Sequence, residues 1–367
     1  MLYQFDSRVV LILDAGGTNF VFSAMRGGQI ISDPITLPSN ANNIEKCLGA
    51  LEQGFNSVLK SLKEEPVAIS FSFPGPANYP EGIISSDLPN FPAFADTDGF
   101  PLKDYLEDLF KIPVFINNDG DLYAFGEAHF GFLPKVNAQL KELGSSKQYK
   151  NLVGLTFGTG FGAGIVIDGK LLIGDNSCGA EIFPLRNKEI PACFVEETVS
   201  IRGLVRMYKE ESGKDDVKVS PEDIFLIAEG KRLGDREAAL RTFNRFGDVA
   251  SDAIADMATL IDGLVVIGGG IAGASKYFMP QILKELNGTI AKVGGGTIGR
   301  IPQKAYNLCE ESEFKKFASS NGVELVLNNR KIWYDKERKL GIGISDIGAT
   351  TAIMRGAYSY ALSQLGE

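Results

Sequence analysis

The feature that most constrains the fold is a pattern of strand, glycine turn and strand that occurs twice in the chain. A short apolar run over residues 9–13 leads into Asp-Ala-Gly-Gly-Thr-Asn at 14–19, and a second strand is predicted over 20–25. The same order returns about 145 residues later, where a strand over 151–157 leads into Gly-Thr-Gly-Phe-Gly-Ala-Gly at 158–164. Nothing repeats at the period of about 20–50 residues that marks solenoid proteins. The pattern therefore predicts a duplicated architecture with two related halves.

The composition favours a small-molecule partner. The 367 residues include 37 Lys and Arg against 46 Asp and Glu, a net charge of −9, and a chain of this charge is repelled by polyphosphate. We therefore expect neither a nucleic acid nor a membrane as partner. The one histidine, His129, cannot make a two-histidine metal site, and we interpret it as structural. The four cysteines include no CxxC pair, and the apolar run at 9–13 is too short for a signal peptide or a membrane span, so we expect a cytoplasmic protein.

The remaining segments alternate between strand and helix patterns. Apolar runs predict further buried strands, and apolar residues at helical spacing predict amphipathic helices. The predicted strands are 67–73, 114–117 and 264–267, and the predicted helices are 43–63, 102–110, 195–210, 236–258 and 345–365. The charged segment 310–340 gives no sharp prediction. This alternation is typical of an α/β fold.

Two further glycine patterns match common phosphate-binding motifs only in part. Residues 164–171 fit GxxxxGK, but they end in Leu171 in place of a hydroxyl residue and join two β-like segments, so a P-loop is not expected. Gly268, Gly270 and Gly273 fit GxGxxG after a strand, yet no clear acidic strand end follows about 20 residues on. Close packing of a helix on a strand explains these glycines better than a dinucleotide site does.

The first glycine turn combines groups that suit a nucleotide phosphate. Asp14 ends a buried strand, where an unpaired carboxylate is costly unless it holds a cation or hydrogen bonds. Gly16 and Gly17 expose backbone N–H groups, and Thr18 and Asn19 add side-chain donors, which together can form an anion nest. A purely structural turn is the alternative.

The second glycine turn offers the same donors from the other half of the chain. Thr159 takes the place of Thr18 between Gly158 and Gly160. Two such turns facing each other would hold a polyphosphate from both sides, and the strand ending in Gly268, Gly269 and Gly270 would back an adenosine.

Five motifs in order resemble the ROK family of sugar kinases, in the actin-like ATPase (Hsp70–hexokinase) superfamily. They are Leu-Ile-Leu-Asp-Ala-Gly-Gly-Thr-Asn (11–19), Asn-Asp-Gly-Asp (118–121), Thr-Phe-Gly-Thr-Gly-Phe-Gly-Ala-Gly (156–164), Val-Val-Ile-Gly-Gly-Gly-Ile (265–271) and Ser-Asp-Ile-Gly-Ala-Thr-Thr-Ala-Ile (345–353). The resemblance implies a two-lobed, duplicated ribonuclease H-like α/β fold with a central cleft. The N-terminal lobe would be residues 1–118, with a C-terminal helix at about 345–367 packed back on it, and the larger lobe would be 119–344.

The resemblance also implies the reaction, which is phosphorylation of a hexose on a primary hydroxyl by ATP with Mg²⁺. Glucose or an N-acetylhexosamine would be the sugar, and the protein would be a homodimer. Asp119 would be the general base, and Asp14 would help to hold Mg²⁺. The local sequence agrees, because Asp119 lies where a strand ends and a helix opens, so the helix dipole would keep its carboxylate ionised. A mere helix cap is the alternative.

Sugar-binding residues are carried over from the family motifs. Asn118 and Asn90 would bind sugar hydroxyls, and Gly75 lies in a Pro-Gly-Pro loop that borders the sugar. Glu181 and Glu196 would complete the ring, with Glu197 as the alternative if its helix is shifted by one residue. The nucleotide contacts would be Asp14, Gly16, Gly17, Thr18, Asn19, Gly158, Thr159, Gly160, Gly268, Gly269 and Gly270.

The chain departs from the family pattern in one region. The family motif Glu-x-Gly-His reads Glu181-Ile-Phe-Pro184 here, and only Cys193 remains of the cysteine motif that follows, so no zinc is expected. Two other functions stay open. A sugar-responsive repressor would need a DNA-binding domain ahead of Asp14, where we see no room for one. A sugar-binding module without catalysis is the second alternative, and the two retained phosphate turns argue against it.

Overall fold

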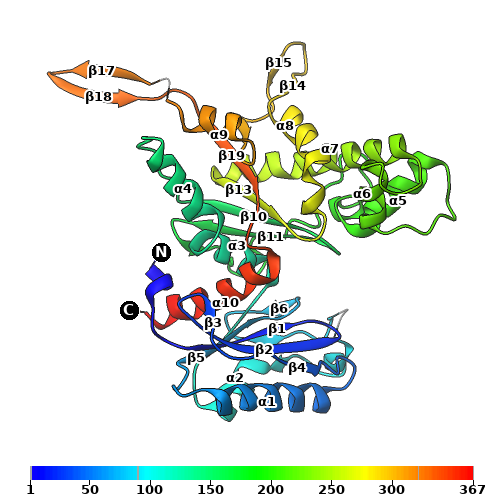
Figure 1. Cartoon of the computed structure of the whole chain (residues 1–367), viewed down its shortest axis with the longest axis vertical. Helices are drawn as coiled ribbons and strands as arrows, with labels where there is room; N and C mark the ends of the chain where they lie inside the picture. The colour runs from blue at the N-terminus through cyan, green and yellow to red at the C-terminus, as the bar shows by residue number, and fades with distance from the viewer. Residues whose placement is uncertain (1, 89–90, 321, 367) are drawn as a thin grey trace. The chain divides into compact units, whose positions relative to one another are not determined.

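The computed structural model describes residues 2–88, 91–320 and 322–366, and the chain divides into two compact units (Figure 1). Unit 1 comprises residues 1–134, 164–180 and 346–367. Unit 2 comprises residues 135–163 and 181–345. Among the described residues, none of the helices is long and apolar enough to cross a membrane.

Unit 1 is built on a six-stranded sheet in the order β3-β2-β1-β5-β9, with β4 paired to β2. Strands β1, β5 and β9 are parallel, and β2 is antiparallel to β1. All five residues of β5 and the first four of β1 are buried, which is typical of parallel strands covered on both faces. The strands are β1 (Val10–Ala15), β2 (Asn19–Arg26), β3 (Gln29–Ile30), β4 (Ile35–Pro38), β5 (Ala68–Ser72) and β9 (Val114–Asn117).

Helices cover both faces of this sheet. On one side lie α1 (Ile44–Ser61) and α2 (Leu102–Phe110), and on the other lies α10 (Ala349–Leu365) (Figure 1). Helix α1 begins after Asn43, whose side chain accepts a hydrogen bond from the Lys46 N–H. Its buried face includes Cys47, Leu51, Phe55 and Val58, which join one hydrophobic core with the sheet.

Small elements complete unit 1. They include the fully buried Phe91 and Phe94, which belong to the core. The elements are η1 (Leu2–Phe5), β6 (Ala77–Asn78), β7 (Ile83–Ile84), η2 (Pro92–Phe94), β8 (Phe100–Pro101) and the end of β11 (Phe161–Ile167) with its hairpin partner β12 (Lys170–Leu171).

Helix α3 (Asp119–His129) packs against α10 at very short range. A Cβ on Gly126 would lie 1.9 Å from the Ala352 carbonyl oxygen, and one on Gly356 would lie 1.9 Å from the Leu122 carbonyl oxygen. Gly164 allows β11 a similar approach, because its Cβ would lie 2.4 Å from the carbonyl oxygen of Gly120. These contacts place α3 and residues 164–180 in unit 1, whereas the sequence places the boundary at residue 118.

Unit 2 contains a second parallel sheet, with neighbouring strands in the order β10-β13-β19-β16. The strands are β10 (Leu152–Phe157), β13 (Leu264–Gly268), β16 (Lys304–Asn307) and β19 (Lys339–Ile344). The long helix α7 (Arg236–Ile261) packs against α8 (Ser275–Leu286) and α5 (Ile201–Ser212) (Figure 1). The other elements are α4 (Phe132–Glu142), which begins in unit 1, η3 (Val195–Glu197), α6 (Pro221–Ala228), η4 (Ala272–Ala274), α9 (Glu311–Ala318) and two hairpins, β14 (Thr289–Ala291) with β15 (Thr297–Gly299) and β17 (Val323–Leu327) with β18 (Arg330–Tyr334).

Candidate active site

Three parallel strands of unit 1 bring their carboxyl ends to one edge of the sheet. Asp14 in β1 lies opposite Ser72 in β5, and Ser72 lies opposite Asn117 in β9. The predicted residues Gly75, Asn118 and Asp119 follow these strands within three residues. The carboxyl edge of a parallel sheet is where ligands of α/β proteins commonly bind. The structure therefore gathers the unit 1 candidates on one edge.

Helix α3 begins at Asp119, and Asn118 occupies its N-cap position. The Asn118 Oδ1 accepts a hydrogen bond from the Gly120 N–H at 2.7 Å, and the Asp119 Oδ1 accepts from the same N–H at 2.9 Å. Since Asn118 already caps the helix, Asp119 is not required as the cap. The capping bond also engages the oxygen of Asn118, one of the predicted sugar ligands.

The Asp119 carboxyl has a raised pKa. Desolvation by surrounding protein is the largest cause, the backbone hydrogen bonds lower the pKa, and the negative charge of Asp14 raises it further. The residue is nevertheless reached by solvent. The two observations are compatible, because water can touch a side chain that still lies among many protein atoms. The sequence-based expectation that the helix dipole dominates is thus only partly met, since desolvation outweighs it.

Asp14 is half-buried, and burial raises the pKa of its carboxyl. Within residues 2–88, 91–320 and 322–366, no ion pair or side-chain hydrogen bond reaches this carboxylate. Mg²⁺ is usually bound through one or two carboxylates together with substrate phosphates and water. No cluster of three ligating side chains exists in the described part of the chain. The role of Asp14 in binding Mg²⁺ stays a prediction.

The glycine turn between β1 and β2 is tight and exposed. The Gly16 N–H donates to the Asn19 carbonyl at 3.0 Å, and a Cβ on Gly16 would lie 2.9 Å from that oxygen. Buried Ser39 supports the turn, because its hydroxyl donates to the Gly17 carbonyl at 2.6 Å and its N–H donates to the Thr18 carbonyl at 2.9 Å. Residues 16–19 remain open to a ligand.

The Pro-Gly-Pro loop is held in place by Tyr79. The Tyr79 hydroxyl donates to the Phe73 carbonyl at 3.0 Å. A Cβ on Gly75 would lie 2.8 Å from that hydroxyl oxygen, so only glycine fits here without a shift. Asn90, the other predicted sugar ligand of this region, lies outside the described residues.

In unit 2 the two glycine loops lie side by side. Thr156 of β10 is paired with Gly268 of β13, so the turn after β10 and the Gly268–Gly270 loop follow adjacent strands. Gly269 has a φ of 87°, and its Cβ would lie 2.4 Å from the Phe157 carbonyl oxygen. Only glycine tolerates both conditions, so Gly269 has a packing role beside its predicted nucleotide contact.

Glu196 lies against the second glycine turn. Its Oε2 accepts a hydrogen bond from the Phe161 N–H at 2.8 Å, and its Oε1 lies 2.9 Å from the Arg202 guanidinium. A Cβ on Gly160 would lie 2.6 Å from Oε2, so this glycine makes room for the carboxylate. The Arg202 guanidinium also pairs with Glu197 at 2.9 Å. Glu196 and its alternative Glu197 therefore already have protein partners.

The loop that departs from the family pattern is organised by Asn187. This buried side chain donates to the Thr198 hydroxyl at 2.7 Å and to the Phe194 carbonyl at 3.4 Å, and its oxygen accepts from the N–H groups of residues 189 and 190 at 3.0 Å. Its backbone N–H donates to the Cys193 carbonyl at 3.1 Å. The hydrogen bonds of Asn187 thus fix the segment that leads into Glu196. Glu181, at the start of the loop, is exposed.

Three supporting residues, Ser39, Asn187 and Arg202, were not found by sequence reasoning. Ser39 binds a turn that precedes it in the chain, and Asn187 binds a loop that follows it. Neither residue belongs to a known motif, so the sequence carries no signal for them. Arg202 had a signal, because an arginine five residues after Glu197 at the start of a helix can reach back to the acidic pair.

Comparison with known proteins gives consistent relatives. Residues 10–298 match the ROK family. A glucokinase from Thermotoga maritima is 29% identical over 291 residues, which cover 75% of this chain and 86% of that protein. The crystal structure of a glucokinase from Parabacteroides distasonis is 53% identical with a TM-score of 0.91, over 99% of both chains. A ROK family glucokinase from Streptomyces griseus, solved with glucose and AMPPNP, is 20% identical with a TM-score of 0.58, over 97% of this chain and 99% of that one. The predicted actin-like ATPase fold class is confirmed by these neighbours.

Proposed function

Because the chain belongs to the ROK family, we propose that it is an ATP-dependent hexose kinase in which Asp119 takes the proton from a primary hydroxyl of the sugar. The observation that carries the proposal is the pair of carboxylates at one sheet edge of unit 1. Asp14 lies near the end of β1, and Asp119 follows β9, the two strands that flank β5 in the sheet. Both carboxyls have raised pKa values, and the negative charge of Asp14 raises the pKa of Asp119.

This pair suits phosphoryl transfer. The reaction needs groups that position the phosphates, a cation, and a carboxylate that receives the proton of the acceptor hydroxyl. A general base is most effective when its pKa lies near the working pH, so a raised pKa improves an aspartate for this task. Asp119 also stays open to solvent and is not consumed as the helix cap, which leaves its second oxygen available.

The nucleotide would be bound by the glycine turns. Gly16 to Asn19 and Gly158 to Gly160 offer backbone and hydroxyl donors to phosphate oxygens, and Gly268 to Gly270 would lie against the adenosine. Asp14 would hold Mg²⁺, which would neutralise charge on the phosphates when bound. The ROK glucokinase solved with AMPPNP supports ATP as the donor.

For the sugar we propose glucose first and an N-acetylhexosamine second. The 53% identity to a glucokinase over nearly the whole chain supports glucose. Pro184 in place of the family histidine removes one sugar contact, so this order has to be tested directly. A coupled assay of ADP release with glucose, N-acetylglucosamine, mannose, N-acetylmannosamine and fructose measures it.

The decisive variant is Asp119→Asn. Removal of the base is expected to lower kcat by about 10²–10⁴-fold, the usual contribution of a general base. Asp104→Asn is the matched control, because Asp104 is also an exposed aspartate in the first turn of a unit 1 helix and should keep wild-type turnover. Turnover above about a tenth of wild type in Asp119→Asn would refute the assignment.

A wild-type chain that binds sugar by calorimetry but releases no ADP with any sugar would instead support the sugar-binding module. Omission of Mg²⁺ in the same assay tests the cation, and addition of Zn²⁺ chelators without loss of rate tests the expectation that no zinc is needed.

A further inference from the structure

The hairpin of β17 and β18, residues 323–334, forms a two-stranded ribbon in unit 2. Its strands are antiparallel and joined by Asn328 and Asn329, both with left-handed φ values of 49° and 61°, as a tight hairpin turn requires. The sheet has no third strand among the described residues. Figure 1 shows the ribbon extending away from α9 and β19 of its own unit. An isolated two-stranded ribbon is marginally stable in water, so this one needs a partner surface.

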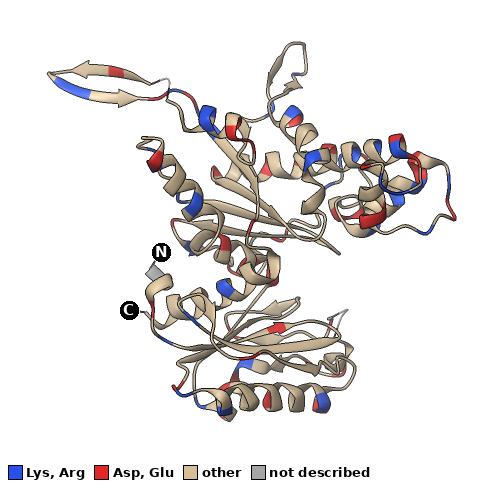
Figure 2. Ribbon diagram, in the orientation of Figure 1, with Lys and Arg blue, Asp and Glu red and all other residues tan. Residues whose placement is uncertain are grey.

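The two faces of the ribbon differ sharply. Residues opposite each other in an antiparallel pair share a face. One face, here called the apolar face, carries the pairs Val323 with Tyr334, Leu325 with Ile332 and Leu327 with Arg330. The other, here called the charged face, carries Glu324 with Trp333 and Val326 with Lys331, and a Lys331–Glu324 ion pair of 3.0 Å crosses it. Charged residues colour only short stretches of the ribbon (Figure 2).

One side chain of the charged face, Trp333, is placed beside other parts of unit 2. Trp333 lines a cavity of about 1000 Å³ formed by residues 143–151, 317–320 and 335–339, and no residue of the apolar face lines it. A Cβ on Gly322 would lie 2.6 Å from the Trp333 ring, so the ring lies on the Gly322 backbone. Side chains of both faces remain exposed, including Val326 at 65% and Trp333 at 60%. The apolar face is distinguished by its five apolar side chains.

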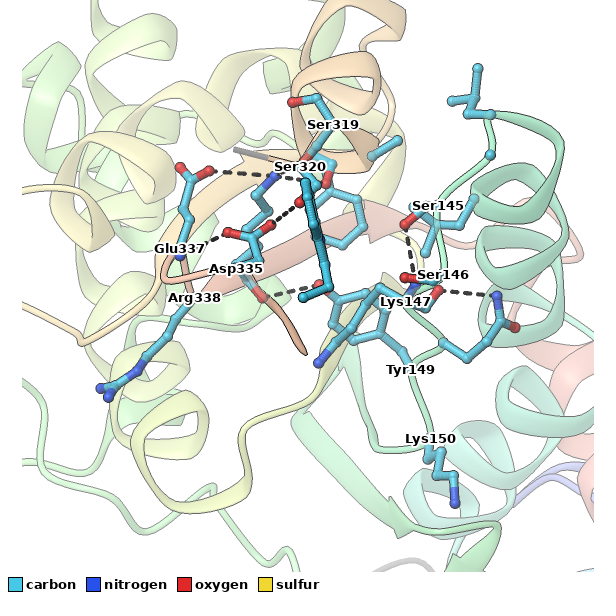
Figure 3. Close-up of a pocket in the computed structure, with 18 of the residues that line it drawn as sticks. Ser145, Ser146, Lys147, Tyr149, Lys150, Ser319, Ser320, Asp335, Glu337 and Arg338 are labelled. Atoms are coloured by element: carbon cyan, nitrogen blue, oxygen red, sulfur yellow. Dashed lines mark hydrogen bonds and ion pairs between the residues drawn. The ribbon is translucent and has the colours of Figure 1, made fainter. Parts of the chain in front are cut away.

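The base of the ribbon is held firmly. The Ser320 hydroxyl donates to Asp335 at 2.7 Å, and Asp335 accepts the Glu337 N–H at 3.0 Å (Figure 3). These bonds connect the two ends of the hairpin just outside its strands. Because the base is fixed, the ribbon loses little conformational entropy when its apolar face binds a partner.

The exposed area is large for a surface without a partner. The five apolar side chains, Val323, Leu325, Leu327, Ile332 and Tyr334, are 46–65% exposed. They leave on the order of 500 Å² of apolar surface open, which is at the upper end of what monomers show in one patch. Two such faces packed together would remove on the order of 1,000 Å², close to the about 1,200 Å² at which stable specific interfaces begin.

We infer that the apolar face of the ribbon docks on the same face of a second copy of this chain. A two-fold axis through the Leu325–Ile332 pair makes the contact self-complementary. It lays the tip of each ribbon over the base of the other. Arg330, the one charged residue of the apolar face, lies at the tip and has no ion pair or hydrogen bond with the described residues. The axis brings it to the base of the partner ribbon, close to the partner's Asp335.

This surface is separate from the proposed sugar kinase site, so the two proposals can fail independently. It also lies beyond residues 10–298, the part of the chain that matches the family, and it gives the expected homodimer a specific interface.

Leu325 and Val326, which are neighbours in the chain but lie on opposite faces of the ribbon, provide the test. Sedimentation of the full chain at micromolar concentrations should show a dimer. Leu325→Glu places a charge in the middle of the apolar face and is expected to raise the dimer dissociation constant by at least about tenfold. Val326→Glu places the same charge beside Lys331 on the charged face and should leave the dissociation constant unchanged. Thermal unfolding of both variants checks that the fold is kept.

A cross-link gives a positive test of the geometry. With the exposed Cys178 and Cys309 changed to Ser, Ile332→Cys should form a disulfide-linked dimer on oxidation, whereas Lys331→Cys should not. A monomeric wild-type chain, equal effects of Leu325→Glu and Val326→Glu, or a dimer that Ile332→Cys does not cross-link would each overturn the inference.

Discussion

The two glycine turns follow similar strands but handle charge in opposite ways. In unit 1, Asp14 precedes the turn, its carboxylate has no protein partner within the described residues, and neutral Ser39 supports the turn. In unit 2 the neutral Thr156 precedes the turn, and the carboxylate of Glu196 supports the turn while Arg202 neutralises it. One half of the duplicated architecture thus keeps an unneutralised acid, and the other half keeps a paired one.

This difference in charge separates a carboxylate expected to act in the reaction from a carboxylate that holds the shape of a turn. An unpaired, desolvated carboxylate is costly in the free protein and is retained where it binds a cation or proton during function. A paired carboxylate that accepts a backbone N–H fixes the shape of a turn. We therefore expect changes in the unit 1 turn to act on the chemical step and changes in the unit 2 turn to act on nucleotide binding.

Among changes at the two turns, the largest expected effect comes from Asp14→Asn. Loss of the carboxylate is expected to lower kcat by about 10²-fold at saturating Mg²⁺, because a preorganised group that stabilises developing charge typically contributes that much. The measurement is a titration of rate against Mg²⁺. Rescue of full kcat by high Mg²⁺ would mean that Asp14 only binds the metal in the ground state.

The same variant should be more stable than the wild type at neutral pH. The pKa of Asp14 is raised by burial, so the folded state holds this proton more tightly than the unfolded state, and stability falls as pH rises through the raised pKa. At neutral pH the ionised carboxylate thus destabilises the fold, and asparagine removes that cost. A lower Tm for Asp14→Asn would contradict this account of the unit 1 turn.

A smaller effect is expected from Glu196→Ala. The Phe161 N–H and the Arg202 guanidinium each lose a partner, the turn at 158–161 loosens, and KM for ATP should rise by about tenfold, or ~1.4 kcal/mol. Initial rates at varied ATP and varied sugar separate the two substrates. Glu197→Ala is the matched control, because Glu197 pairs with the same arginine but makes no bond to the turn. A rise in KM for the sugar alone would favour the sugar-binding role that the family resemblance implies.

Strands and helices with a strong apolar period were predicted well from the sequence. The strand before Asp14, the helix after Asn43 and the long helix that became α7 all lie where the patterns place them. The sequence missed the division of the chain, since the close packing of Gly126 and Gly356 that places α3 in unit 1 depends on two segments more than 200 residues apart. It also missed the ribbon at 323–334. Its strands have an apolar and a charged face, but alternation over five residues is a weak signal beside the surrounding charges.

For the site, the residues of the turns could be predicted because each turn is local in sequence. Two of their supports could not, because Ser39 and Asn187 act through contacts that only the fold creates. Arg202 had a local signal that sequence reasoning missed. Glu196 is the instructive case, since its position in a family motif predicted a sugar ligand whereas its carboxylate lies on the glycine turn.

The smallest expected effect is a displacement of the pH profile, and it links the two acids of unit 1. Asp119 can accept a proton only when ionised, so kcat/KM should fall as pH drops through its raised pKa, above the ordinary aspartate value of about 3.9. The negative charge of Asp14 is one cause of that raised pKa, so the acid limb should move to lower pH in Asp14→Asn. In Glu196→Ala the limb should stay in place, because the charge of Glu196 is already neutralised by Arg202 within unit 2. Profiles of kcat/KM for the three proteins measure this, and an acid limb that stays put in Asp14→Asn would show that the two carboxylates are not coupled.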